Sequence, residues 1–185
     1  ASCLYYYPQG SKSGADGVWN DNFEFWPGLQ ADGTAPVGSF PYEEAYVFEG
    51  WIDEYDGSWA SVEPYAIGIV TFPDEVAAYT GALGTWAFAD DQPRMSAELV
   101  EYPWDKDISM WRSTCKVSAN DTAHSFIHQC DAEGAGQPLI VYDDGGHYVV
   151  GMNIGVAGNR NLALRLHPAV FDWISAFEEE DDMED

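Results

Sequence analysis

The segment 130–152 constrains the fold more than any other part of the chain. Cys130 opens a glycine-rich turn that ends at Pro138, and the apolar run 139–142 follows directly. A second apolar run, 148–152, comes after the turn residues 143–146, Asp-Asp-Gly-Gly. Two short apolar runs joined by a glycine-containing turn are typical of a β-hairpin. The sequence therefore predicts a β-rich fold built around this hairpin.

The composition predicts a packed and strongly acidic protein. Of its 185 residues, 46% are apolar and 15% aromatic, which is enough for a core. No apolar run approaches the roughly 20 residues that cross a bilayer, so we expect no membrane insertion. The net charge is −25, and it remains −18 when the seven acids of residues 178–185 are removed. This excess opposes binding to nucleic acid and favours cationic partners, divalent ions or solubility at high salt.

Cysteine usage points to an oxidising compartment. Of the three cysteines, Cys115 and Cys130 flank a predicted strand-turn-strand segment and are placed to close a short loop. The sequon at Asn120 indicates glycosylation and agrees with the same compartment. We therefore expect a protein that is secreted or lies in an organelle lumen.

Other elements follow from apolar periodicity. Alternation and flanking prolines predict strands at residues 22–28, 45–52 and 65–72. Apolar side chains at helical spacing after Pro168 predict a helix up to residue 177. The acidic residues 178–185 are expected to be a disordered tail.

The turn after Cys130 resembles the nucleophile loop of trypsin-fold serine proteases. The closest likeness is to the bacterial-type glutamyl endopeptidases, whose loop usually reads Gly-Asn-Ser-Gly-Ser-Pro. Further likenesses follow in the same order over residues 1–177, among them Pro27-Gly28, Gly50-Trp51 and Met110-Trp111. The resemblance implies an all-β fold, a trypsin-like double β-barrel with a short C-terminal helix, whose first barrel lacks its N-terminal strands.

The same resemblance implies a domain division and a set of partners. Residues 1–80 would be the remainder of the N-terminal barrel, residues 81–177 the C-terminal barrel with its closing helix, and residues 178–185 the tail. A disulfide between Cys115 and Cys130 would bridge the hairpin that these residues flank. Cys3 matches a cysteine whose partner lies upstream, so its bond would reach outside this chain. We expect the first barrel to be completed by the protein's own cleaved N-terminal segment or by another protein.

The catalytic positions implied by the resemblance carry residues that cannot perform acyl transfer. That chemistry requires a nucleophile, a histidine base, a carboxylate and two backbone N–H groups for an oxyanion. The nucleophile, base and acid positions are Ala135, Ser2 and Pro64. The oxyanion turn is altered to Glu133 and Gly134, and a carboxylate at Glu133 would repel an oxyanion if it pointed inward. The sequence therefore predicts a pseudoprotease.

Without catalysis, the sequence predicts a protein-binding or structural subunit. Asn153 stands where the glutamyl-specific enzymes often have a substrate-reading histidine, and Trp104 stands where the family has glycine. Trp104 with Trp51, Trp59 and Trp111 suggests an aromatic surface, unless these side chains fill the core. The four histidines are scattered, so we expect no metal site, and no cofactor motif is present.

Three alternative functions stay open at this point. The first is a subunit built permanently into a larger assembly. The second is a calcium-responsive acidic extracellular protein, for which the acidic loop 53–57 offers oxygen ligands. The third is an active serine endopeptidase with displaced catalytic residues.

Overall fold

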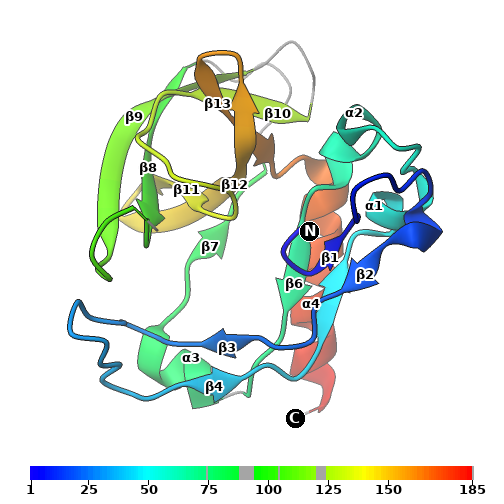
Figure 1. Cartoon of the computed structure of the whole chain (residues 1–185). Helices are drawn as coiled ribbons and strands as arrows, with labels where there is room; N and C mark the ends of the chain where they lie inside the picture. The colour runs from blue at the N-terminus through cyan, green and yellow to red at the C-terminus, as the bar shows by residue number, and fades with distance from the viewer. Residues whose placement is uncertain (74, 88–93, 104, 120–123, 185) are drawn as a thin grey trace.

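The C-terminal half of the computed structural model forms a closed barrel of six antiparallel strands (Figure 1). The structure describes residues 1–73, 75–87, 94–103, 105–119 and 124–184. Around the barrel the strands pair in the order β8, β9, β10, β13, β12 and β11, and β11 pairs again with β8. β7 (Gly84–Thr85) adds to β12 in parallel. The barrel strands are β8 (Met95–Glu101), β9 (Trp111–Ala119), β10 (Ser125–His128), β11 (Pro138–Asp143), β12 (Gly146–Ala157) and β13 (Arg160–Arg165).

Alternating side chains fill the barrel. In β8, Ala97, Leu99 and Glu101 face inward, as the period of two in a strand requires. Leu99 lies opposite Leu139 of β11, and both are fully buried in the main apolar cluster. The predicted hairpin is present as β11 and β12, with Asp144 and Gly145 at positive φ in the turn.

The N-terminal half consists of three two-stranded ladders and several short helices. The ladders pair β1 (Tyr5–Tyr6) with β2 (Val18–Trp19), β3 (Glu24–Phe25) with β4 (Phe40–Pro41), and β5 (Ala45–Val47) with β6 (Gly68–Val70). The helical turns are η1 (Gly14–Asp16), α1 (Glu49–Asp53), α2 (Trp59–Val62), η2 (Glu63–Tyr65) and α3 (Glu75–Thr80). Within the described ranges of residues 1–87, these strands do not close into a barrel.

The N-terminal strands are shorter than the sequence predicts. The strand predicted at 45–52 ends at Val47 and gives way to α1, because Trp51 turns into the core and its indole N–H donates to the Tyr5 carbonyl at 2.9 Å. Gly50 permits this turn, since a Cβ there would lie 2.7 Å from the Tyr65 ring. The strand predicted at 65–72 is reduced to β6, and at its start η2 takes Tyr65 and is capped by Ala66.

The C-terminal helix α4 (Pro168–Glu184) is longer than predicted. Its apolar face, including Val170 and Trp173, packs on Leu164 and Leu166 at the end of the barrel. Figure 1 shows the helix running beside β6 and away from the barrel. Residues 178–184, predicted to be disordered, continue this helix, because glutamate is a good helix former and the preceding turns are already anchored.

No helix in the described part of the chain combines the length and apolar character that a membrane span needs.

Candidate functional site

The structure brings Ser2 and Ala135 together in one small cleft between the N-terminal segment and the turn before β11. Trp59, Met152 and Asn153 also line it. The cleft offers about 20 Å³, which is room for about one water molecule. Ala135 contributes only a methyl group, so the residues at the two positions cannot act as a nucleophile and base pair.

Pro64 is held elsewhere by contacts with the start of α4. Its carbonyl oxygen accepts a hydrogen bond at 3.3 Å from Nε2 of His167, whose ring packs edge-on against His124. Burial is the main cause that lowers the pKa of His167, and the bond to Pro64 opposes it. The neighbouring Glu63 has a buried Oε1 without a hydrogen-bond partner among the described residues. Neither residue is among those lining the cleft.

Asn153 fastens the turn that carries Ala135. Its Nδ2 donates to the Gly134 carbonyl at 2.6 Å and to Gln137 Oε1 at 3.1 Å. Its Oδ1 accepts from His128 Nε2 at 3.0 Å, and its backbone exchanges hydrogen bonds with Gly136 and Gln137. With every polar atom bonded and 1% of its surface exposed, Asn153 is a structural clamp. The predicted binding role of Asn153 would require it to leave these partners.

The turn is also held by Glu101, the last inward-facing residue of β8. One carboxylate oxygen of Glu101 accepts a hydrogen bond at 2.9 Å from the backbone N–H of Glu133. Gln137 Nε2 donates to the Glu133 carbonyl at 2.9 Å. In a trypsin-fold enzyme the N–H two residues before the nucleophile is one of the two that hold the oxyanion. If Ala135 stands at the nucleophile position, as the resemblance implies, that group is the Glu133 N–H, which already donates to the Glu101 carboxylate.

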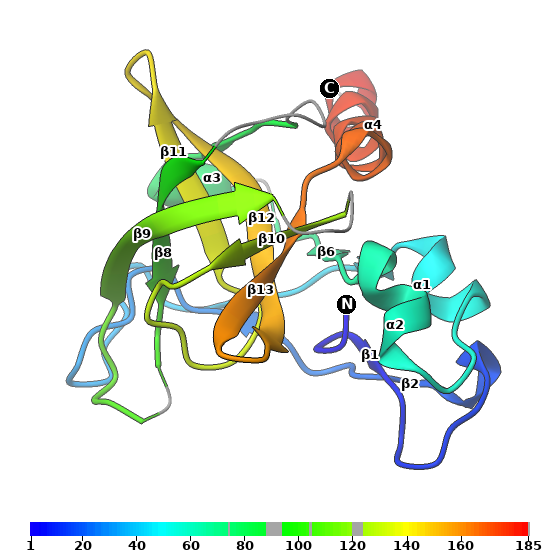
Figure 2. The ribbon, with the colours of Figure 1, turned by 90° about the horizontal axis from the view of Figure 1, so that it is seen from above.

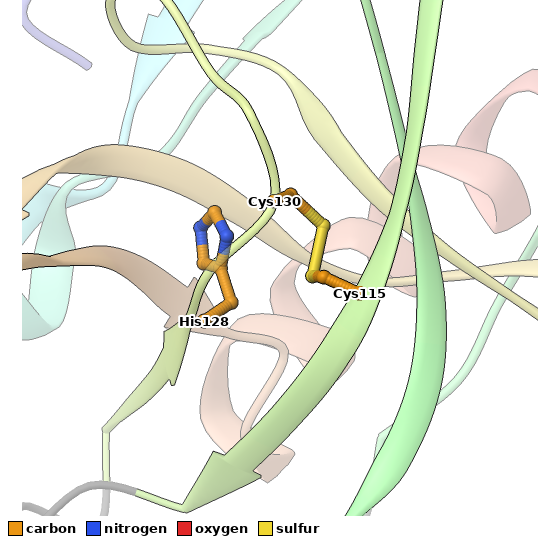
Figure 3. A group of neighbouring side chains, drawn as sticks. All are labelled: Cys115, His128 and Cys130. Atoms are coloured by element: carbon orange, nitrogen blue, oxygen red, sulfur yellow. A yellow bond between two sulfur atoms is a disulfide. The ribbon is translucent and has the colours of Figure 1, made fainter.

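His128 lies beside a disulfide between β9 and the end of β10. Cys115 and Cys130 are bonded to each other, and Figure 3 shows the His128 ring next to the pair. The two sulfurs and a ring nitrogen lie within 4.8 Å of one another. Disulfide sulfurs are not thiolates, which are the form that ligates metals, so the oxidised group packs the barrel end. Burial lowers the pKa of His128, which keeps the ring neutral.

The tryptophans, Asn120 and Cys3 are the remaining residues that the sequence singles out. Trp104 and Asn120 lie outside the described residues. Cys3 is an exposed thiol with no disulfide partner in the described part of the chain, so its bond to an outside partner stays a prediction. The suggestion that Trp51 forms part of an aromatic surface is wrong, since it is 1% exposed and fills the N-terminal core, while Trp59 and Trp111 are exposed.

Sequence reasoning missed Glu101 and Gln137 as residues that hold the turn. For Glu101 a signal exists, because it follows Ala97 and Leu99 at a spacing of two and so occupies an inward position of a strand. An acid at such a position needs a buried donor. Nothing in the sequence identifies the Glu133 N–H as that donor, since the contact joins the end of β8 to a turn 32 residues further along the chain.

Comparison with known proteins supports the fold described above. No family model matches the sequence, and no curated protein matches it. A solved structure of Glu endopeptidase in complex with MPD matches with a TM-score of 0.74 and 18% identity, over 91% of this chain and 77% of that one. The protease Anisep from Arthrobacter nicotinovorans matches with a TM-score of 0.68 and 15% identity, over 87% and 76%.

A thermostable serine protease, AL20, from an extremophilic microorganism matches with a TM-score of 0.60 and 17% identity, over 83% of this chain and 76% of that one. At these identities the likeness concerns the fold alone. The chain therefore has the trypsin-like fold that the sequence predicts, all-β in its barrel with a C-terminal helix.

Proposed function

We propose that this chain is a non-catalytic protein of trypsin-like fold that binds another protein. The observation that carries the proposal is the hydrogen bond from the Glu133 N–H to Glu101. An oxyanion would have to displace a carboxylate that is 7% exposed and leave it buried without a partner, at a cost of roughly 1–3 kcal/mol or more. Ala135 supplies no hydroxyl, and the cleft of about 20 Å³ does not admit a substrate side chain.

A wide apolar groove supports the binding role. The groove has a volume of about 590 Å³ and lies between the β3–β4 loop, α3 and the loop that follows β8. Its most exposed apolar side chains are Met110 at 66% and Tyr79 at 62%. Its other large lining residues are Phe25, Trp26, Leu29, Val37 and Tyr102. Contiguous exposed aromatic and methionine side chains are typical of protein interfaces.

The charge of the chain selects the occupant of this groove. With 32 acids against 7 lysines and arginines, the surface repels anionic partners and attracts cationic ones. Within the β3 ladder, Glu24 accepts a hydrogen bond from the Trp26 indole at 3.0 Å, which places a carboxylate beside the groove. The occupant we propose is an extended protein segment with aromatic or aliphatic anchors flanked by lysine or arginine.

Catalysis is tested with the purified chain, a fluorophosphonate probe and a set of ester and peptide substrates. We expect no covalent labelling and no turnover. Ala135→Ser should not restore activity, because Glu101 still occupies the Glu133 N–H. Labelling or turnover that disappears in Ser2→Ala would overturn the non-catalytic assignment, since it would place a working nucleophile in the cleft.

Binding is tested by fluorescence anisotropy with two labelled peptides of equal length, one alternating Trp or Leu with Lys and the other with Glu. We expect the lysine peptide to bind more tightly and Tyr79→Ala or Met110→Ala to weaken it about tenfold, as loss of an interface anchor does. Val156→Ala, an exposed apolar residue outside the groove, is the matched control. Equal affinity for both peptides, or equal effects of all three variants, would refute the proposal that the groove binds a cationic segment.

A further inference from the structure

Three of the seven lysines and arginines of this acidic chain surround a single pocket. Arg94, Lys116 and Arg160 line it together with Ser118 and Gln129, and its volume is about 170 Å³. Among the described residues that line this cationic pocket there is no carboxylate. The pocket shares no lining residue with the cleft at Ala135 or with the apolar groove.

Strand register explains why the cations meet. Val117 pairs with Met95 of β8 and with His128 of β10, and Val117 and His128 are buried in the barrel wall. Their strand neighbours Lys116, Ser118 and Gln129 therefore point outward. Continuing the two registers by one residue places Arg94 beside Ser118 and Arg160 beside Gln129. Figure 2 shows β8, β9, β10 and β13 in the barrel wall.

Among the described residues, the three cations have no acidic partner. Ion pairs between described side chains join Lys106 to Asp131 and Arg112 to Glu98. In the same part of the chain, Arg94, Lys116 and Arg160 have no carboxylate partner within 4.0 Å, although acids outnumber bases 32 to 7. Lys116 Nζ donates instead to the Ser96 hydroxyl at 2.5 Å. Like charges that line one pocket repel, and an anion between them removes that repulsion.

We propose that the cationic pocket is a binding site for a small tetrahedral oxyanion of the phosphate or sulfate class. Planar guanidinium groups bind such oxygens in a bidentate manner, and an ammonium adds a point charge. The Ser118 hydroxyl and the Gln129 amide supply neutral donors. A pocket of about 170 Å³ lies below the roughly 300–1,000 Å³ that drug-sized ligands occupy, so the anion is small. This inference does not depend on the proposed function.

The test is an isothermal titration of the full chain with inorganic phosphate and, separately, sulfate, each against sodium chloride at equal ionic strength. We expect saturable heats with phosphate or sulfate and none with chloride, and the stronger of the two identifies the preferred anion. Arg160→Gln and Lys116→Gln should each weaken binding about tenfold, because each removes charge-assisted hydrogen bonds. Lys12→Gln, an exposed lysine that does not line the pocket, should change nothing.

A second measurement locates the anion. In two-dimensional ¹H–¹⁵N spectra, phosphate should shift the amides of Ser118 and Gln129, and Arg160→Gln should reduce those shifts. All three variants change exposed side chains, for which stability changes within about 0.5 kcal/mol are usual, so misfolding does not obscure the result. Absence of saturable binding, or an equal loss of affinity in Lys12→Gln, would overturn the proposal.

Discussion

The carboxylate of Glu101, at the end of β8, accepts a hydrogen bond at 2.9 Å from the backbone N–H of Glu133. The contact joins the barrel wall to the turn that carries Ala135, and Gln137 binds the carbonyl of the same residue, Glu133. The Glu133 N–H is thus part of the internal bonding of this barrel and is not free to bind another acceptor.

Replacement of Glu101 should destabilise the fold without producing activity. Glu101→Ala leaves the Glu133 N–H without its acceptor, and we expect a loss of about 2 kcal/mol in the free energy of unfolding, measured by urea denaturation. Glu101→Gln keeps an oxygen acceptor and should lose less. A Glu101→Ala variant as stable as the wild type would show that the bond contributes nothing.

Asn153 should contribute to the stability of the turn that carries Ala135 about as much as Glu101 does. Asn153→Ala removes two donated hydrogen bonds and leaves His128 Nε2 without its acceptor, so a loss of roughly 2–3 kcal/mol is expected in the same urea experiment. The matched control is Asn159→Ala, because Asn159 is exposed in the β12–β13 turn. Similar effects of the two substitutions would contradict the conclusion that Asn153 holds the turn that carries Ala135.

Stability should decrease as pH falls below the ordinary histidine pKa of 6.5. Burial lowers the pKa of His128 in the folded protein, against the smaller effect of its bond to Asn153. The unfolded chain therefore takes up a proton first, and the stabilisation present above pH 6.5 is lost progressively toward the folded pKa. His167 acts in the same direction.

His128→Gln isolates this effect. The free energy of unfolding of variant and wild type is compared between about pH 7.5 and about pH 5.5. The wild type should lose more stability than the variant over this interval, since titration of the acidic residues is common to both. If the free energies of unfolding of variant and wild type changed in parallel with pH, the pKa of His128 would be the same in the folded and unfolded states.

The disulfide should contribute through the short loop it closes. Cys115 and Cys130 are separated by 15 residues, and a loop of that size predicts about 3 kcal/mol of stabilisation from the lower entropy of the unfolded chain. Cys115→Ala combined with Cys130→Ala should lose about that amount in thermal and urea unfolding. Cys3→Ser in the purified chain should stay within about 0.5 kcal/mol of wild type, as surface substitutions do, and a larger loss would give Cys3 a structural role.

The sequence by itself determined the β11–β12 hairpin of the C-terminal barrel, while the barrel was implied by the family resemblance. The strand β11 carries a continuous apolar run, and the turn between β11 and β12 contains the glycine that its backbone requires. Local pattern decides such elements because each buries a large apolar face of its own. The start of α4 at Pro168 is decided in the same way.

Only the tertiary structure decided the N-terminal half and the chemistry of the surface. Residues 45–52 have the composition of a strand, and the burial of Trp51 against Tyr5 converts half of them into a helix. The Glu101 contact with Glu133 and the meeting of Arg94, Lys116 and Arg160 join residues far apart in sequence. Such contacts depend on strand register and barrel closure, and a linear pattern carries no information about which distant groups will lie opposite one another.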